Sequence, residues 1–119
     1  MRIVVTNNPM VRDKAGPDTI EFLDTDYLGV LITARDRVHT GHELLTHPLS
    51  GSVKPGETPY KTVVLNAGKS SLNEESLNII ENSIQTYYNL VKSSRSKTWS
   101  REILSDFQLI DYDLIFSNR

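Results

Sequence analysis

The sequence predicts an α/β protein: a three-layer, Rossmann-like sandwich with a small, mostly parallel sheet of about four strands, in one domain over residues 1–119. The first observation is that short apolar runs rich in β-branched residues alternate with segments whose apolar residues recur at helical spacing. The second is their order, strand-helix-strand-helix-strand-loop-strand-helix-helix, which is typical of a sheet covered by helices on both faces. Right-handed crossovers then predict the core strand order 2-1-3.

Two apolar runs, with a helix N-cap signal between them, predict the first strand-helix-strand unit. Ile3–Val5 is apolar and β-branched, as buried strands are, and Ile20–Leu23 alternates as a second strand does. Between them, Asn8 is a good N-cap residue and precedes a proline that suits the first helical position. We therefore predict a short helix over Pro9–Ala15 that Gly16 ends.

A second helix follows the second strand. Asp24, Thr25 and Asp26 can cap its start, the helix runs to about Thr40, and Gly41 stops it. Its apolar residues keep helical spacing and predict the buried face: Tyr27, Val30, Leu31, Ala34 and Val38.

Two more strands are expected in the middle of the chain, Leu44–Thr46 as the third and Thr62–Leu65 as the fourth. The long loop between them leaves the direction of the fourth strand open, because parallel neighbours usually need a helical crossover.

Two helices complete the predicted fold. A long helix is expected from about Ser71 to Ser93, with Glu74 and Glu75 near its positive N-terminal end. A final helix is predicted from the spacing of its apolar residues: Leu104, Phe107, Ile110, Leu114 and Ile115.

Composition excludes several classes of protein. Net charge is -2, from thirteen basic and fifteen acidic residues, whereas a protein that neutralises nucleic-acid phosphates should be clearly basic. The chain has no cysteine, which removes disulfides and thiolate chemistry. The apolar run near the N-terminus is too short for a signal peptide, and no run approaches the ~18 residues that span a membrane. We expect a soluble, cytoplasmic protein that binds neither nucleic acid nor membrane.

Polar residues gather where two predicted strands end. In an open α/β sheet, ligands bind beyond the carboxyl ends of the strands, where neighbouring connections leave for opposite faces. The order 2-1-3 puts that crevice between the first and third strands. The predicted ligand-binding residues are Thr6, Asn7 and Asn8 after the first strand, and Thr46, His47, Ser50, Gly51, Ser52 and Lys54 after the third.

The chemistry of these two clusters favours a small anionic ligand, such as an amino acid, an acyl phosphate or a nucleotide. The first cluster opens a helix, whose free N–H groups attract anions. In the second, Gly51 permits close backbone approach, two serines offer hydroxyl groups, and Lys54 supplies a positive charge.

Purely structural roles remain as alternatives. Asn8 with Pro9 is a complete helix start without any ligand, and residues 50–52 could form an ordinary turn. Neither a Walker loop nor a GxGxxG motif occurs. His39 and His42 flank a helix end, where a cation near the last carbonyls favours a structural role.

Catalytic and metal chemistry find little support. The three histidines, His39, His42 and His47, fit no familiar zinc spacing, and HExxH is absent, so no metal site and no cofactor are expected. His47 could pair with Ser50 or Ser52, but the GxSxG elbow is missing and no acid is placed to orient the imidazole. The catalytic residues, if there are any, stay unknown.

Three stretches carry a resemblance to a known family. They are "TNNP" after the first strand, "THPLSGSVKPGETPYKTVVL" in the middle and "SLNEESLNIIENSIQTY" in the long helix. The sequence resembles the GrdX family, small proteins encoded with the glycine, sarcosine and betaine reductase systems of amino-acid-fermenting anaerobes. The resemblance spans most of the chain, through "DFQLIDYDLI".

The resemblance implies a cytoplasmic accessory protein of amino-acid reduction, with components of such a reductase system as partners. It carries over no catalytic residues. A chain without cysteine cannot itself perform the reductase's thiol-dependent redox chemistry.

Three function classes remain open on the sequence. The first is an accessory or regulatory protein that binds a small anionic ligand in the crevice. The second is an enzyme that uses His47 with a serine or threonine. The third is a purely protein-binding factor, for which Trp99 and the C-terminal tyrosines could supply an oligomer surface.

Overall fold

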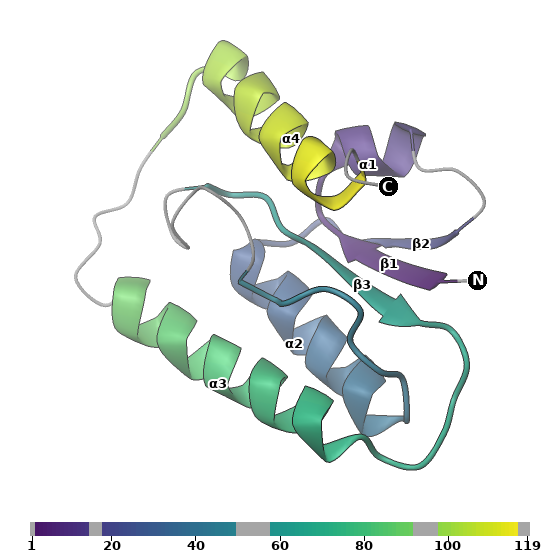
Figure 1. Ribbon diagram of the computed structural model, residues 1–119. Coiled ribbons are helices and arrows are strands. Elements are labelled where there is room, and N and C mark those ends of the chain that lie inside the picture. The colour runs from purple at the N-terminus through teal and green to yellow at the C-terminus, as the bar shows by residue number, and fades with distance from the viewer. Residues whose placement is uncertain (1, 15–17, 50–57, 92–97, 117–119) are drawn as a thin grey trace.

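A three-stranded sheet lies between two pairs of helices (Figure 1). The computed structural model describes residues 2–14, 18–49, 58–91 and 98–116. The elements in chain order are β1 (Arg2–Thr6), α1 (Pro9–Lys14), β2 (Thr19–Phe22), α2 (Tyr27–His39), β3 (Thr62–Asn66), α3 (Glu74–Val91) and α4 (Arg101–Phe116). Helices α2 and α3 cover one face of the sheet, and α1 and α4 cover the other (Figure 1). The predicted α/β class and helix coverage on both faces are confirmed.

The sheet is mixed, with the strand order β2-β1-β3. Strand β1 pairs in parallel with β2, so that Val4 lies opposite Ile20. It pairs antiparallel with β3, so that Val4 also lies opposite Val64. The prediction of a mostly parallel, Rossmann-like sheet of about four strands is therefore wrong, although the strand predicted to be first does lie in the centre.

The predicted third strand contributes only one bridge. Leu44 pairs with Leu65 at the outer edge of β3, where the Leu45 amide donates to the Val64 carbonyl at 2.8 Å. Strand β3 thus separates this segment from β1, which contradicts the predicted adjacency of the first and third strands. The reason is burial: Val64 and its apolar neighbours in β3 are buried, whereas the side chain of Leu45 is 49% exposed.

The antiparallel direction of β3 follows from its connection. The described residues between α2 and β3 contain no helix that could carry the chain back for a parallel crossover. The chain returns instead along the edge of the sheet and enters β3 from the end at which β1 stops.

The larger part of the core lies between the sheet and α2 and α3. On α2, the buried residues are the five that its periodicity predicted: Tyr27, Val30, Leu31, Ala34 and Val38. They pack with Val5 of the central strand and with Ile80 and Ile84 of α3. Burial of this apolar face holds α2 against the sheet and α3.

The ends of α2 are also as predicted. Asp26 is its N-cap, and its side chain accepts a hydrogen bond from the Gly29 amide at 2.8 Å. After the C-cap residue Thr40, Gly41 has a φ of 104°, a backbone conformation that favours glycine. The sequence signals at both ends were therefore sufficient to bound this helix.

A smaller core lies on the other face of the sheet. Val4 and Val5 are neighbours in β1 and point to opposite faces, as successive strand residues do. Val4 packs with Val11 of α1, Val64 of β3 and Phe116 of α4. The N-terminal strand therefore contributes to both cores.

The last two helices differ in detail from the prediction. Helix α3 starts at Glu74, and the side chain of Asn73 accepts a hydrogen bond from the Ser76 amide at 2.7 Å, so the start predicted at Ser71 is early. In α4, Asp111 is buried while Leu114, which belongs to the predicted apolar face, is 40% exposed. Within the described residues, no helix combines the length and apolar character that crossing a membrane requires.

Candidate functional site

Three chain segments meet at one edge of the sheet. Thr6 at the end of β1 lies opposite both Phe22, at the end of β2, and Thr62, at the start of β3. The residues that follow β1 and β2 and those that precede β3 therefore share this edge. It is the edge of the carboxyl ends of the parallel pair, where α/β proteins commonly bind ligands.

A cavity of about 410 Å³ opens at this edge. Its wall combines residues after β1 and β2, residues before β3, and side chains from α2, α3 and α4. The lining residues are Asn7, Pro9, Phe22, Asp24, Thr25, Asp26, Tyr27, Thr58, Pro59, Tyr60, Tyr87, Trp99 and Leu104. Its volume lies within the range of roughly 300–1,000 Å³ that is usual for small-molecule sites.

Asn7 fixes three of these segments relative to one another. Its carboxamide oxygen accepts from the Lys61 amide at 2.9 Å. Its Nδ2 donates to the carbonyls of Thr25 at 3.0 Å and Pro59 at 2.8 Å. Asn7 thus lies in the cavity wall, and its polar atoms hold the wall together. Its predicted contact with a ligand stays a prediction.

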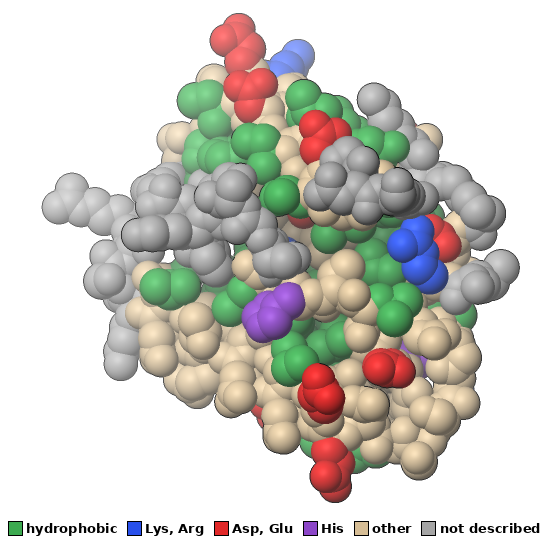
Figure 2. Space-filling model, viewed as in Figure 1, with side chains coloured by type: hydrophobic (Ala, Val, Ile, Leu, Met, Phe, Trp, Pro, Cys, Tyr) green, Lys and Arg blue, Asp and Glu red, His purple; other side chains and the backbone are tan. Residues whose placement is uncertain are grey.

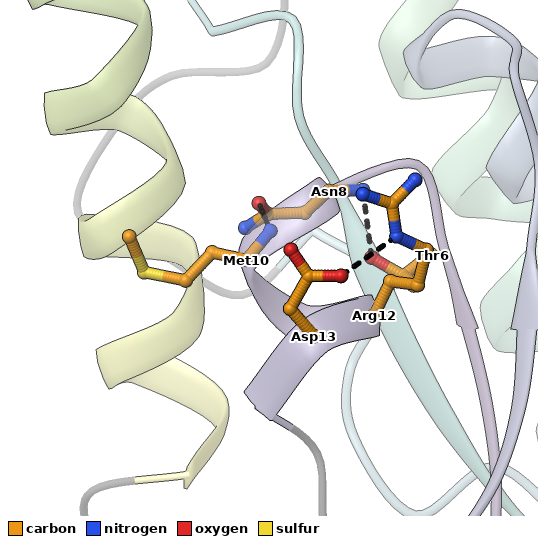
Figure 3. A network of polar contacts seen from close by, with 5 residues as sticks. All are labelled: Thr6, Asn8, Met10, Arg12 and Asp13. Atoms are coloured by element: carbon orange, nitrogen blue, oxygen red, sulfur yellow. Dashed lines mark hydrogen bonds and ion pairs between the residues drawn. The ribbon is translucent and has the colours of Figure 1, made fainter.

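Thr6 and Asn8 are buried and bonded within the chain (Figure 3). The Asn8 amide donates to the Thr6 hydroxyl at 3.0 Å, and the Asn8 side-chain oxygen accepts from the Met10 amide at 3.0 Å. Asn8 therefore caps α1, a helix of six residues. The role that the sequence offered as the alternative, capping, is the one that the contacts of Asn8 display.

The two described residues of the second predicted cluster do not line the cavity. The Thr46 hydroxyl accepts from the Val64 amide at 3.0 Å and so ties the segment to the edge of β3. His47 is exposed, and its Nδ1 accepts from the Leu49 amide at 3.1 Å. The remaining residues of the cluster, Ser50, Gly51, Ser52 and Lys54, lie outside the described residues, so their ligand contacts stay a prediction.

The other histidines do not approach the cavity. His39 is exposed at the end of α2, and His42 is buried with its Nδ1 2.9 Å from the Asn66 carbonyl. Because a carbonyl only accepts, Nδ1 of His42 is the donor. Over the described parts of the chain, no three His, Asp or Glu side chains cluster as a metal site would require.

A buried polar cluster, which the sequence did not predict, lies behind the cavity wall. Asp111 of α4 accepts hydrogen bonds at one carboxylate oxygen from the Thr62 hydroxyl at 2.6 Å and from Nδ2 of Asn8 at 3.0 Å. The Thr62 hydroxyl also pairs with that of Thr6 at 2.8 Å. Side-chain hydrogen bonds thereby join residues of β1, β3 and α4.

Lys61 belongs to the same cluster. It is 3% exposed, and its Nζ lies 5.9 Å from the ring centroid of Tyr27 in the cavity wall. Burial lowers the pKa of Lys61 to about 8, and the negative charge of Asp111 opposes this shift. Burial raises the pKa of Asp111, while hydrogen bonds from Thr62 and Asn8 and the charge of Lys61 act to lower it.

Aromatic rings form much of the cavity wall. Tyr27 and Tyr87 stack with ring centroids 4.9 Å apart, and Trp99 meets Phe107 edge to face at 5.9 Å. Burial raises the pKa of Tyr27 and, with the nearby Asp26 carboxylate as a second cause, that of Tyr87. Sequence periodicity predicted that Tyr27 is buried, which it is, and gave no sign that it shares a cavity with Tyr87.

The fold and the site define a small mixed α/β protein with an aromatic-lined cavity at the carboxyl-end edge of its sheet. The chain belongs to the GrdX-like protein family, whose model matches residues 3–118. No curated protein and no solved structure matches it. The family resemblance expected from the three sequence stretches is thus confirmed over nearly the whole chain.

Proposed function

We propose that this chain is an accessory protein of a glycine reductase-type system of amino-acid fermentation, and that it binds a small ligand in the cavity at the edge of the sheet. Membership of the GrdX-like family supports the association with such systems. The absence of cysteine from the sequence supports an accessory role rather than thiol-dependent catalysis by this chain.

One observation carries the ligand-binding part: the cavity of about 410 Å³ between the ends of β1 and β2 and the start of β3. Aromatic rings surround it, and a small number of polar groups converge on it, as in small-molecule sites generally. Asn7 stiffens its wall through three hydrogen bonds to neighbouring segments. The anionic character of the ligand was predicted from the helix start after Asn8 and from Ser50, Gly51, Ser52 and Lys54, and it remains part of this proposal.

Trp99 makes ligand binding directly measurable. It lines the cavity and is the single tryptophan of the sequence, so its fluorescence should report occupancy. A small-molecule screen of amino acids, carboxylates and phosphates, followed by this signal, should find ligands that saturate. The variant Thr25→Phe puts a ring at the cavity wall and should abolish the response.

The matched control for that variant is Thr40→Phe. Thr25 precedes the first turn of α2 and lines the cavity, whereas Thr40 follows its last turn; both side chains are exposed. Thr40→Phe should bind as the unchanged protein does. Equal loss in both variants, or no saturable signal from any compound, would contradict a site in this cavity.

The association with a reductase system has a separate test. The purified chain is added to a reconstituted glycine reductase, and its binding to each component is followed by calorimetry. We expect a saturable complex with one component or a change in the turnover of the system. A chain that neither binds any component nor alters turnover is not an accessory of that system.

A second candidate, protein binding through self-association, is favoured by one face of α4. Ile103, Phe107, Ile110 and Leu114 are spaced by four, three and four residues, which is the spacing of a seam between two like helices. Ile103 and Leu114 are 45% and 40% exposed, and Figure 2 shows hydrophobic side chains gathered over α4. The occupant that this spacing fits is α4 of a second copy.

Sedimentation velocity over a range of protein concentrations tests this candidate. The unchanged chain should show a dimer whose population falls when Ile103 and Leu114 are replaced by lysine. The exposed Leu90→Lys variant is the control and should leave the dimer intact. If the chain were a monomer at every concentration, self-association through α4 would be refuted.

A further inference from the structure

The charged residues of the cavity wall are of one sign. Among its described lining residues, two are acidic, Asp24 and Asp26, and none is Lys, Arg or His. Five lining residues are aromatic: Phe22, Tyr27, Tyr60, Tyr87 and Trp99. Carboxylates and aromatic faces both attract positive charge, the first as anions and the second through the ring quadrupole.

Two of these rings already have cations from the chain itself over their faces. The guanidinium carbon of Arg12 lies 4.7 Å from the ring centroid of Phe22, and Nζ of Lys61 lies 5.9 Å from that of Tyr27. Distances of this size are those of cation–π contacts. The remaining rings of the wall are those of Tyr60, Tyr87 and Trp99, from the segment before β3, from α3 and from the residues before α4.

The carboxylates of Asp24 and Asp26 lie in the cavity wall, where they could interact with a bound cation. Asp24 and Asp26 are exposed, and within the described residues neither forms an ion pair. The cap hydrogen bond from the Gly29 amide fixes the Asp26 carboxylate in place. Its charge contributes to the raised pKa of Tyr87, so its negative potential reaches the aromatic wall.

We infer that the cavity binds the positively charged end of a small organic ammonium compound, held by the rings of Tyr60, Tyr87 and Trp99 and by the carboxylates of Asp24 and Asp26. This inference rests on the proposed function, because it takes the cavity to be a ligand site. An ammonium group with methyl substituents fits such a wall best, since its methyl groups pack on the rings and bring its positive charge to the ring faces.

The test uses choline and its uncharged isostere 3,3-dimethylbutan-1-ol as probes, with acetate as an anionic probe. Each is titrated into the full chain, and binding is followed by Trp99 fluorescence and by calorimetry. We expect choline to bind at least about fivefold more tightly than the isostere, the advantage that a cation–π contact of about 1 kcal/mol provides. Acetate should bind more weakly than choline, and choline affinity should fall as salt is added.

Substitutions in the cavity wall test whether choline binds there. Asp24→Asn should weaken choline binding about twofold to fivefold and flatten its salt dependence, because the carboxylate is exposed and partly screened. Asp36→Asn, at an exposed position of α2 outside the cavity wall, should change nothing. Tyr60→Leu should weaken binding about twofold to fivefold, whereas Tyr60→Phe keeps the ring and should retain it.

The outcomes separate the two proposals. If the isostere or acetate binds as tightly as choline, the cavity is a ligand site and the inference of an ammonium ligand is overturned. If Asp24→Asn and Asp36→Asn behave alike while Tyr60→Leu binds as Tyr60→Phe does, binding lies elsewhere and the inference is likewise overturned. If no probe gives a saturable signal by either method, both the cation inference and the ligand-binding part of the proposed function fail.

Discussion

Asp111 is the side chain on which the junction between α4 and the sheet depends. It is 8% exposed and accepts hydrogen bonds from Thr62 and Asn8. Replacing it by alanine leaves a donor of Asn8 short of an acceptor and removes the negative charge beside Lys61. We expect Asp111→Ala to lower the free energy of unfolding by about 2–4 kcal/mol.

Urea unfolding followed by circular dichroism measures this loss. Asp106→Ala is the matched control, because Asp106 lies on the same helix and is exposed. Its effect should stay within about 0.5 kcal/mol. Similar losses in the two variants would mean that the buried carboxyl group contributes no more than a surface one.

Lys61 should make stability depend on pH. Its pKa is about 8 in the folded chain and 10.5 as the ordinary value. Between these values the unfolded chain binds a proton that the folded chain does not, so stability falls as pH falls toward the folded pKa. We expect the free energy of unfolding to rise by about 1–2 kcal/mol from about pH 7.5 to about pH 9.5.

The comparison that isolates Lys61 is the same pH series on two variants. Lys61→Met should lose most of this rise, while Lys69→Met, at an exposed position, should retain it. The series stops below the ordinary tyrosine pKa of 10.0, because Tyr27 and Tyr87 have raised pKa values and oppose stability at higher pH. An unchanged slope in Lys61→Met would assign the pH dependence to other groups.

Single residues were predictable where their role is local. Asn8 was readable as a helix cap because its partner, the Met10 amide, lies two residues away. The burial of Asp111 was not, because its partners Thr62 and Asn8 are far away in the sequence and a carboxylate among apolar helix residues normally indicates the solvent side. Pairings of this kind become visible only once the tertiary contacts are known.

The end of α2 depends on a glycine that no other residue replaces easily. Gly41 has a φ of 104°, and a Cβ there would meet the backbone oxygen of Ser70. We expect Gly41→Ala to lower the free energy of unfolding by about 1–3 kcal/mol, because the backbone must strain or move. Thermal and urea unfolding measure the change.

Gly68 supplies the control for this substitution. Among the described residues, a Cβ at Gly68 would meet the side-chain oxygen of Asn66 at an ordinary contact distance of 3.5 Å. Gly68→Ala should therefore change stability by less than about 1 kcal/mol. A larger loss at Gly68 than at Gly41 would refute the conformational argument.

Helices could be predicted from the sequence better than strand pairing. Caps and the apolar period define a helix within its own segment, which is why α2 lies where it was expected and α1 begins at Pro9 as expected. The predicted end of α1, at Ala15 and Gly16, lies outside the described residues. Strand direction depends on a connection whose length permitted both directions. The edge segment Leu44–Thr46 looks like a strand in the sequence, but among the described residues it pairs only with β3. The prediction placed the ligand site beyond the end of β1, where the cavity lies, but paired it with the predicted third strand, which does not line the cavity. The aromatic wall includes Tyr87 and Trp99, which are far along the chain.

At the scale of the whole molecule, the two cores are unequal. Among the described residues, ten form the buried cluster on the side of α2 and α3, and four form the one on the side of α1 and α4. Strand β1 lies in the centre and is hydrogen-bonded on both edges. Regions with fewer buried apolar contacts open at lower free energy.

Native-state hydrogen exchange at increasing urea should resolve this difference. We expect the amides of β1 and α2 to exchange only through global unfolding, and those of α4 to exchange through an opening of lower free energy. Asp111→Ala should further lower the free energy of the partial opening of α4. The amides of α4 should still exchange through a lower free energy than those of β1 and α2. If the amides of α4 and α2 exchanged through one common opening, the prediction that α4 opens separately would be contradicted.

The antiparallel pairing of β1 with β3 has a consequence for synthesis. Thr6 and Thr62, which pair in the sheet, are 56 residues apart in the sequence. Asn8 and its hydrogen-bond partner Asp111 are 103 residues apart. At a translation rate of about 5–20 residues per second, β1 spends about 3–11 seconds with one edge unpaired after it has been made. An apolar strand with an open edge is a template for pairing with other nascent chains, so crowded polysomes are where this protein is most exposed to aggregation.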